Sequence, residues 1–216
     1  VLGMSGWVDC STVAMLCKNA VIKVHLVILP YGEHMKNSNT YSNAMEIINE
    51  FDFEYHIFDI KPAVDALIIP TEEKSYRIEL AKANIRPRIR MTYLYEYAQI
   101  NNLLVIGTGN LSEATVGYFT KWGDGAHDIN PLANLTKREV YILAKYLGVP
   151  KAIINAKPSA DLWPGQTDED ELGLTYEQID EFILNGTSGD NKIDEIIQTK
   201  KDRNTHKLEP ISKFED

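Results

Sequence analysis

The stretch Val21-Ile-Lys-Val-His-Leu-Val-Ile-Leu29 indicates the fold class of this chain most directly. It is a nearly continuous run of apolar and β-branched residues, which is typical of a parallel strand covered on both faces. Residues 103–106 form a second such run, residues 53–60 predict a third strand, and residues 1–4 resemble the end of a first one. Helical patterns fall between these runs, at about 9–20, 41–51, 72–101 and 136–147. The alternation predicts an α/β fold with a doubly wound, mostly parallel sheet and helices on both faces.

Capping signals support the later boundaries. Thr136-Lys-Arg-Glu139 is a capping box that opens a helix ending at Gly148-Val-Pro150, and Thr175-Tyr-Glu-Gln178 opens another that runs through Leu184. The segment 157–173 has no periodicity, and a loop of this length is usually functional or mobile, so we expect a mobile active-site loop there. Residues 1–216 are predicted to form a single domain. The absent initiator Met suggests that an upstream segment is missing.

The composition excludes several classes of protein. Lys and Arg number 22 against 31 Asp and Glu, a net charge of −9, which argues against broad nucleic-acid binding but not against a nucleotide substrate. No segment approaches the roughly 20 apolar residues of a membrane span, and no signal peptide is expected. The two cysteines, Cys10 and Cys17, are predicted to lie on one helix and form no disulfide framework, so a cytoplasmic location is expected.

A short loop near the start of the chain has the chemistry of a phosphate site. Gly3-Met4-Ser5-Gly6-Trp7-Val8-Asp9-Cys10-Ser11 follows a strand and opens a helix. Such a turn presents unpaired N–H groups and a positive helix end, and its small residues let an anion approach the backbone. Asp9 adds a carboxylate suited to Mg²⁺. The alternative is a small-residue helix cap without any ligand.

Two resemblances to known families follow from quoted motifs. Ser5-Gly-Trp-Val-Asp-Cys-Ser11 resembles the S-G-G-x-D-S pyrophosphate loop of the N-type ATP pyrophosphatases, which split ATP into AMP and pyrophosphate. Residues 107–137 resemble the central signature of NAD synthetase, with G-T-x-N-x-S-E, G-Y-F-T-K-x-G-D-G and D-x-x-P-L in order. Residues 157–162, 170–173, 176–180 and 204–207 are similar to the later loop, helix and H-K pair of that family. The resemblance covers nearly the whole chain.

The resemblance implies a fold, an activity and a set of partners. The fold would be Rossmann-like, of the adenine nucleotide α-hydrolase type. ATP and Mg²⁺ would adenylate the nicotinate carboxylate of deamido-NAD with release of pyrophosphate, and ammonia would then form NAD and release AMP. A chain of 216 residues leaves no room for a glutamine-hydrolysing domain, so free ammonia is the expected nitrogen donor. Family members are homodimers with sites near the interface; no nucleic-acid or membrane partner is expected.

The resemblance also assigns residues, and for most of them the chemistry alone leaves an ordinary interpretation open. ATP would bind the first loop, from Gly3 to Cys10, together with Thr108, Lys137 and Ser159, and Mg²⁺ would bind Asp9 and Glu113. Deamido-NAD would bind Arg88, Lys121, Asp128, His206 and Lys207. Taken alone, Glu113 suits a helix N-terminus, the lysines and Arg88 suit a solvated surface, and Asp128 suits a loop. No nucleophile is required. The remaining histidines show no spacing typical of a metal site: His25, His34, His56 and His127.

Four positions depart from the family pattern. Trp7 replaces the second glycine of the loop, Cys10 its serine, Pro87 a small residue and Ala126 a glycine. Trp7 is expected to block a backbone conformation or to fill phosphate space, Cys10 offers only a weak donor, and Pro87 should break or kink the 72–101 helix. The departures leave three alternatives: a non-catalytic or weakened nucleotide-binding relative, another pyrophosphatase such as a tRNA-modifying thiolase, or errors in the sequence. A thiolase would need extra cysteines and a basic face, and the sequence has neither.

Overall fold

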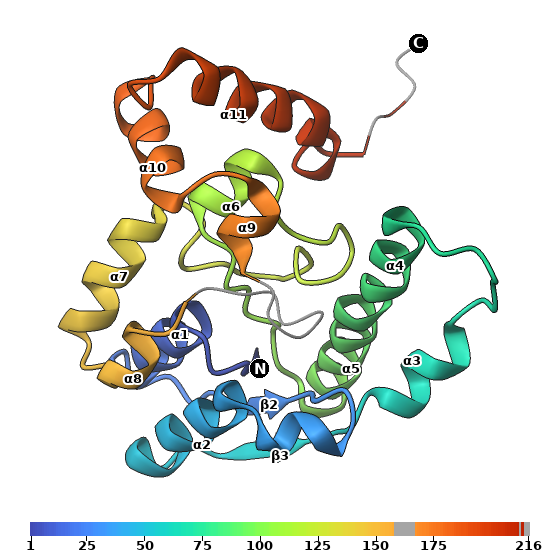
Figure 1. Ribbon diagram of the computed structural model, residues 1–216. Coiled ribbons are helices and arrows are strands. Elements are labelled where there is room, and N and C mark those ends of the chain that lie inside the picture. Colours follow the sequence, from blue (N-terminus) through green and yellow to red (C-terminus); the bar gives the residue numbers. More distant parts are fainter. Residues whose placement is uncertain (158–166, 212, 214–216) are drawn as a thin grey trace.

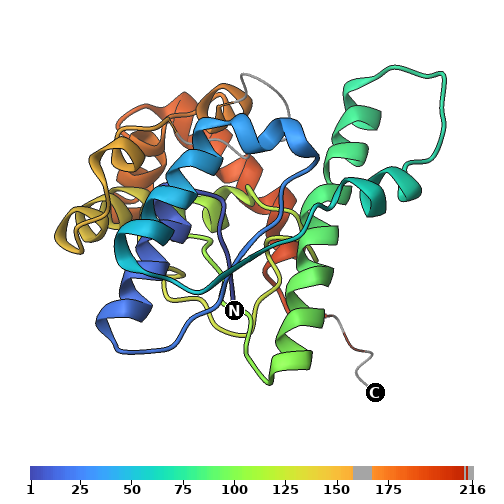
Figure 2. The ribbon, with the colours of Figure 1, turned by 90° about the horizontal axis from the view of Figure 1, so that it is seen from below.

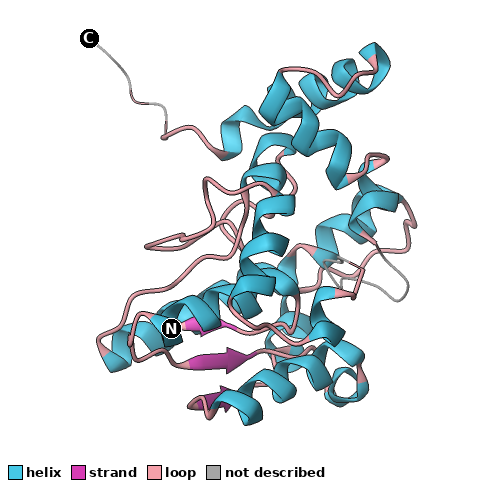
Figure 3. Cartoon of the chain, turned by 90° about the vertical axis from the view of Figure 1, so that its left-hand side faces the viewer, coloured by secondary structure: helices cyan, strands magenta, loops and turns pink. Residues whose placement is uncertain are grey.

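Short parallel strands form the centre of the computed structural model, which describes residues 1–157, 167–211 and 213. β1 (Leu2–Gly3), β2 (Leu26–Ile28) and β3 (Tyr55–Ile57) lie in the order β1-β2-β3 (Figure 3). Two parallel bridges, from Leu2 to Ile106 and from Ile106 to Ile129, continue the sheet beyond β1. The sheet order is therefore β3, β2, β1, Ile106, Ile129, and it reverses between β1 and Ile106.

The predicted strands are confirmed in position but not in length. β2 covers only Leu26–Ile28 of the expected 21–29. Val21 has a φ of 57° and is 92% exposed, because it lies in the turn that follows the first helix. The 103–106 run contributes a single bridge at Ile106, and β3 covers three residues of the expected 53–60. A run of apolar residues indicates that a segment is buried. The hydrogen-bond ladder that defines a β-strand also needs a partner strand at the right distance, so the strands are shorter than the runs.

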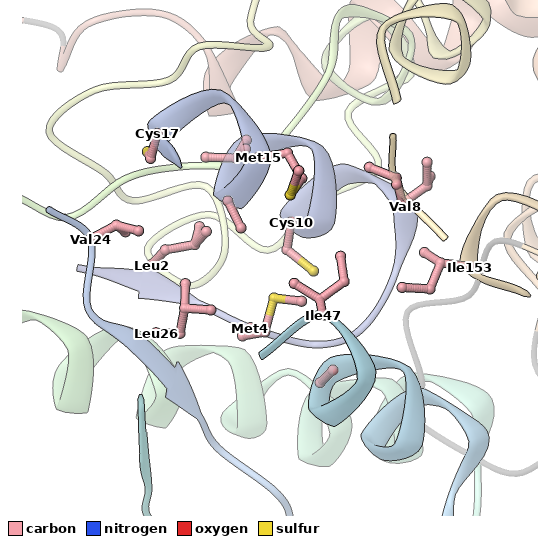
Figure 4. Packing of buried hydrophobic residues seen from close by; sticks show 14 of the residues in the cluster. Leu2, Met4, Val8, Cys10, Met15, Cys17, Val24, Leu26, Ile47 and Ile153 are labelled. Atoms are coloured by element: carbon pink, nitrogen blue, oxygen red, sulfur yellow. The ribbon is translucent and has the colours of Figure 1, made fainter. Parts of the chain in front are cut away.

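Helices cover one face of the sheet. α1 (Val8–Asn19), α2 (Asn39–Phe51) and α7 (Lys137–Tyr146) share a hydrophobic cluster with the strand residues Leu2 and Leu26. Figure 4 shows Leu2, Leu26 and Met4 among Cys10 and Met15 of α1 and Ile47 of α2. Cys10 and Cys17 are both buried on α1 and both are free thiols, as predicted.

The strand residues next to Leu2 and Leu26 face the opposite side of the sheet. Val27 and Val105 pack with Val64 of α3 (Lys61–Leu67) and Ala98 of α5 (Ile85–Asn101). Side chains alternate along a strand, so adjacent residues of one strand enter opposite cores. The doubly wound arrangement is thus confirmed: α3 and α5 lie on one side in Figure 1, and α1, α2 and α7 on the other.

The expected 72–101 helix is two helices. α4 (Tyr76–Ala83) ends at Asn84, which also caps the start of α5, and residues 72–75 are not helical. Pro87 is the third residue of α5, in the first turn, where its missing N–H is not needed for an intrahelical bond. The break thus precedes Pro87 by three residues. In Figure 2, α3, α4 and the segment between them extend outward from the body.

A second group of helices lies at the end of the molecule opposite the sheet (Figure 1). α6 (Leu111–Val116), α9 (Asp168–Leu172), α10 (Tyr176–Asn185) and α11 (Asn191–Asn204) share a separate cluster that includes Val116, Leu172 and Ile197. The capping boxes at Thr136 and Thr175 are confirmed, and Asn110 with Glu113 forms a third. The short elements are η1 (Glu33–Asn37), α8 (Lys151–Ile154) and η2 (Thr205–Lys207).

Two features of the second group differ from the expectations. α11 was not anticipated, and α9 forms inside the segment 157–173 that was expected to be a loop. The rest of the expected mobile loop, residues 158–166, lies outside the described residues. Among the described helices, none has the length and apolar character needed to cross a membrane.

Candidate active site

The candidate site lies where the strand order reverses. The loop of residues 3–10 leaves the carboxyl end of β1, and residues 107–110 leave the segment at Ile106, the neighbour of β1 on the other side. Open α/β sheets bind ligands at such a reversal, because the two diverging loops leave a crevice. A cavity of about 450 Å³ lies here, and both loops line it, together with residues of α5, α6 and α7.

The first loop depends on Gly6. Gly6 has a φ of 88°, and a Cβ there would lie 2.0 Å from the backbone oxygen of Thr40 and 2.9 Å from the backbone nitrogen of Ala44. The next residue, Trp7, is different: it has a φ of −87° and a ψ of 166° and serves as the N-cap of α1. The expectation that Trp7 blocks a backbone conformation is therefore wrong, since any residue adopts these angles. Trp7 is half-buried and is one of the residues that line the cavity.

Cys10 makes hydrogen bonds within the loop of residues 3–10. Its Sγ lies 3.1 Å from the Oγ of Ser5 and donates to the backbone oxygen of Trp7 at 3.2 Å. Ser5 and Trp7 precede Cys10 in the same turn, so the thiol closes the loop on itself. These contacts assign Cys10 a structural place in the loop.

Asp9, Glu113 and Lys137 form a buried ionic cluster. The Lys137 Nζ donates to Asp9 Oδ2 at 2.6 Å and to Glu113 Oε1 at 3.2 Å, and Lys137 is only 2% exposed. Asn110 donates its Nδ2 to Asp9 Oδ1 at 2.9 Å and its backbone N–H to Glu113 Oε2 at 3.2 Å. The cluster joins the starts of α1, α6 and α7. Three residues predicted from separate parts of the sequence are thus brought together.

Burial governs the electrostatics of the cluster. It raises the pKa of Glu113 to about 7, against the opposing effect of Lys137. Burial also disfavours the charge of Lys137, but the carboxylates of Asp9 and Glu113 together raise the pKa of Lys137 above its ordinary value. Two carboxylates therefore share one cation in a site from which solvent is largely excluded.

A third carboxylate completes the surroundings and was not anticipated. Asp168 is buried at the start of α9, and its Oδ2 accepts a 2.8 Å hydrogen bond from the hydroxyl of Tyr176. Its Oδ1 is buried without a hydrogen-bond partner among the described residues. Burial raises the pKa of Asp168, and the Lys137 charge opposes that effect. An unsatisfied carboxylate oxygen beside Asp9 and Glu113 suits a cation, so the residues present fit Mg²⁺.

Tyrosines line the same region. The Tyr176 hydroxyl also lies 3.4 Å from Glu113 Oε1, and its ring lies 4.9 Å from the Lys137 Nζ. Tyr118 donates to Glu171 Oε2 at 2.8 Å. Burial raises the pKa of both tyrosines. Two residues of this region, Tyr118 and Asn110, had a signal in the sequence, since they lie in the 117–125 and 107–113 motifs. No local pattern showed that they share a site with Asp168.

Most of the residues expected to bind the second substrate are also brought together. Arg88 donates to the backbone oxygen of Lys121 at 3.4 Å, and Lys121 donates to the backbone oxygen of His206. Lys207 donates to the backbone oxygens of Gly117 and Phe119 and lines the cavity; burial lowers its pKa. These contacts bring the start of α5, the 117–125 segment and η2 side by side.

Three other predicted residues have different places. Asp128 accepts from the Val105 N–H at 2.7 Å and from the Tyr95 hydroxyl at 3.4 Å, so it is held by the sheet edge and α5 rather than by Lys121. Thr108 lines the cavity. Ser159 lies outside the described residues.

Comparison with known proteins now decides the family. A family model described as NAD synthase matches residues 1–214. The chain belongs to the NAD synthase family. Membership confirms the resemblance seen in the 107–137 signature and does not favour a non-catalytic relative or a different pyrophosphatase.

Individual members of the NAD synthase family are similar over nearly the whole chain. The NH(3)-dependent NAD(+) synthetase of Finegoldia magna is 41% identical over 216 residues, which are 100% of this chain and 87% of that protein. The solved structure of NMN synthetase from Francisella tularensis has a TM-score of 0.88 and 41% identity, covering 98% of this chain and 87% of that one. The NH3-dependent NAD synthetase from Campylobacter jejuni, in complex with the nitrate ion, has a TM-score of 0.78 and 32% identity, covering 99% and 88%.

Proposed function

We propose that this chain catalyses the ATP-dependent amidation of deamido-NAD to NAD, with ammonia as nitrogen donor and AMP and pyrophosphate as products. The observation that carries the proposal is the buried cluster of Asp9, Glu113 and Lys137 at the strand reversal. It lies in a chain that is 41% identical over its full length to an NH(3)-dependent NAD(+) synthetase.

ATP is proposed to bind between the two loops. Residues 3–10 offer backbone N–H groups and the positive end of α1 to its phosphates, and Thr108 lines the same cavity. The family resemblance adds Ser159, which lies outside the described residues. Lys137 keeps its positive charge despite burial, so it stabilises the negative charge that develops on the departing pyrophosphate. Because α7 holds Lys137 in place before the substrate arrives, little reorganisation is needed during the reaction.

Asp9 and Glu113 would hold Mg²⁺, and Asp168 faces the same region. Carboxylate oxygens are the ligands that this ion prefers. When bound, it supplies positive charge that neutralises phosphate oxygens. Asn110 orients the Asp9 carboxylate through a 2.9 Å hydrogen bond to Oδ1, and Lys137 donates to Oδ2.

The group of Arg88, Lys121, His206 and Lys207 is proposed to bind deamido-NAD. Its members come from α5, the 117–125 segment and η2 and form one continuous region through their hydrogen bonds. Lys207 is the member that reaches the cavity. Asp128 would accept hydrogen bonds from a ribose or from the nicotinate side.

A homodimer in the cytoplasm is also proposed. Apolar side chains are exposed around the end of α5 and the outer edge of the sheet, at Ile100, Leu104 and Ile129. Exposed apolar surface is typical of protein–protein interfaces, so a second copy of the chain is proposed to cover these residues. Two free cysteines are consistent with a reducing compartment.

The reaction is tested by its products. Protein supplied with ATP, Mg²⁺, ammonium and deamido-NAD should form NAD, AMP and pyrophosphate in equal amounts, as measured by chromatography. ADP in place of AMP would exclude an acyl-adenylate route. Replacing ammonium with glutamine at the same concentration should lower the rate strongly if free ammonia is the donor.

A second candidate substrate is favoured by one comparison. The solved structure with a TM-score of 0.88 is named an NMN synthetase, whereas the NAD synthetase from Campylobacter jejuni has a TM-score of 0.78. The corresponding substrate would be the nicotinate mononucleotide, which lacks the adenylate half of deamido-NAD. Measuring kcat/KM for both nucleotides under the same conditions decides between them, and the main proposal requires the larger value for deamido-NAD.

A further inference from the structure

His25, Glu54 and His56 form a cluster of metal-ligating side chains away from the candidate active site. Each offers one ligand atom, and these atoms all lie within 4.8 Å of one another. The Nδ1 of His25 and the Nε2 of His56 lie 3.6 Å and 3.8 Å from the same oxygen, Glu54 Oε1. His25 precedes β2 and Glu54 precedes β3, so the cluster lies toward the amino ends of the strands, whereas the loops of the active site leave the carboxyl ends.

Sheet geometry explains why residues far apart in the sequence meet here. Val27 pairs with His56, and the Leu26 N–H donates to the backbone oxygen of Glu54 at 3.0 Å. Residues two apart on a strand share a face, so Glu54 and His56 lie on one side of β3, and His25 shares the corresponding side with Val27. This cluster cannot be recognised from the spacing of residues along the sequence, because two different strands contribute to it.

The surroundings hold the ligand atoms in place. The rings of His25 and His56 stack with centroids 6.5 Å apart, and the Tyr97 ring lies 5.1 Å from His56. The Nε2 of His56 is enclosed and has no hydrogen-bond partner in the part of the chain that the structure describes. Glu54 bonds Lys23 through Oε2 at 3.1 Å, so the other oxygen, Oε1, faces the histidines. The bond to Lys23 lowers the pKa of Glu54 and keeps this carboxylate charged.

We propose that His25, Glu54 and His56 bind a divalent transition-metal ion of the zinc class. Two imidazole nitrogens and one carboxylate oxygen are a ligand set that zinc accepts, with water in the remaining position. Ligands of tetrahedral zinc at 2.0–2.1 Å are about 3.4 Å from one another, so the two distances to Glu54 Oε1 need to shorten only slightly. The Glu54 and His56 side chains are 46% and 40% exposed, so the cluster lies at the surface of the molecule. Binding replaces the 2.9 Å contact between His25 Nδ1 and the Tyr97 hydroxyl and joins β2 to β3.

Zinc titration of the full chain, stripped of metal by a chelator, tests the site. Zn²⁺ is added in the presence of a chromophoric competitor, and Co²⁺ is used in parallel because tetrahedral Co²⁺ absorbs visible light intensely. A single ion per chain should bind at this site and raise the melting temperature. His56→Ala and Glu54→Gln should each weaken this binding by roughly tenfold to hundredfold or more, since they remove a ligand.

Control variants separate this site from the carboxylates of the active site. Glu50→Gln, on the exposed surface of α2, should bind as the original chain does, and so should Glu113→Gln if the ion is at the proposed site. Circular dichroism checks that each variant folds. Binding that survives His56→Ala and Glu54→Gln but is lost in Glu113→Gln would overturn the proposal, and so would the absence of competitive binding in the original chain.

Discussion

At the scale of single residues, Lys137 is the cation on which two buried carboxylates depend. Removing it leaves Asp9 and Glu113 together in a site with little solvent. We therefore expect Lys137→Met to lower the free energy of unfolding in urea by about 3–5 kcal/mol, the usual loss when one partner of a buried ion pair is removed. Activity should fall with it, since the variant lacks the charge proposed to stabilise pyrophosphate.

Magnesium provides the internal check on this prediction. If Asp9 and Glu113 bind the ion, Mg²⁺ should raise the melting temperature of Lys137→Met more than that of the original chain. Lys145→Met, on the exposed side of the same helix, should change stability by less than about 0.5 kcal/mol. A Lys137→Met protein as stable as the Lys145→Met protein would contradict the proposed role.

Trp7 is the second residue with a distinct prediction. Its backbone is unstrained and the residue lines the cavity, so an effect on ATP is expected from the side chain. Trp7→Gly combined with Cys10→Ser should raise kcat/KM for ATP by about 10²-fold, the scale of restoring one or two preorganised donors. Cys10→Ser alone serves as the control for the loop hydroxyl. A change below about threefold in the double variant would mean that the phosphates do not approach Trp7.

At the scale of secondary-structure elements, the cap of α7 links stability to the site. Thr136 accepts from the Glu139 N–H, Glu139 reaches back to the Thr136 N–H at 2.8 Å, and Lys137 is the first helical residue. Thr136→Ala should cost about 1 kcal/mol of stability, as measured by urea unfolding. It should also lower kcat/KM for ATP by roughly tenfold, because the first turn positions the Lys137 ammonium.

Asp190→Ala is the matched control for this cap. Asp190 caps α11 by accepting from the Lys192 N–H, and α11 supplies no residue of the proposed ATP site. The loss of stability should be of similar size, with kcat/KM for ATP unchanged. Equal effects of the two variants on kcat/KM would show that the Thr136 effect is one of stability alone.

The helices also show which local sequence signals were sufficient to predict where a helix begins. The capping boxes at Thr136 and Thr175 predicted the starts of α7 and α10 correctly, because the cap bonds involve only neighbouring residues. α11 had comparable signals, the cap at Asp190 and apolar residues four apart at Ile193 and Ile197, but its polar composition obscured them. The sequence did not predict the junction at Asn84, because the residues before and after it both form helices.

At the scale of the whole molecule, the exposed apolar edge predicts the oligomeric state. Sedimentation of the protein at micromolar concentration should give twice the mass of one chain. Ile100→Glu, which places a charge at one of the exposed apolar residues proposed to form the interface, should shift the protein toward the monomer. Ile142→Glu, at an exposed apolar residue on α7, is the control and should remain dimeric. A monomer in every case would refute the homodimer.

The amino-acid sequence by itself determined the fold class, the position of the strands, the starts of α1, α2, α7 and α10 and the family, because these depend on local patterns and motifs. It also supplied Asp9, Glu113 and Lys137 as candidates through their resemblance to a known signature. Only the tertiary structure decided that these three share one buried cluster, since 128 residues separate Lys137 from Asp9.

The tertiary structure alone also decided the length of the strands, the unstrained backbone of Trp7, the place of Asp168 beside the cluster and the meeting of His25 with His56. Each of these depends on which segments lie next to one another across the sheet. Side chains from different strands and helices become neighbours only when the chain folds, so no spacing along the sequence could reveal them.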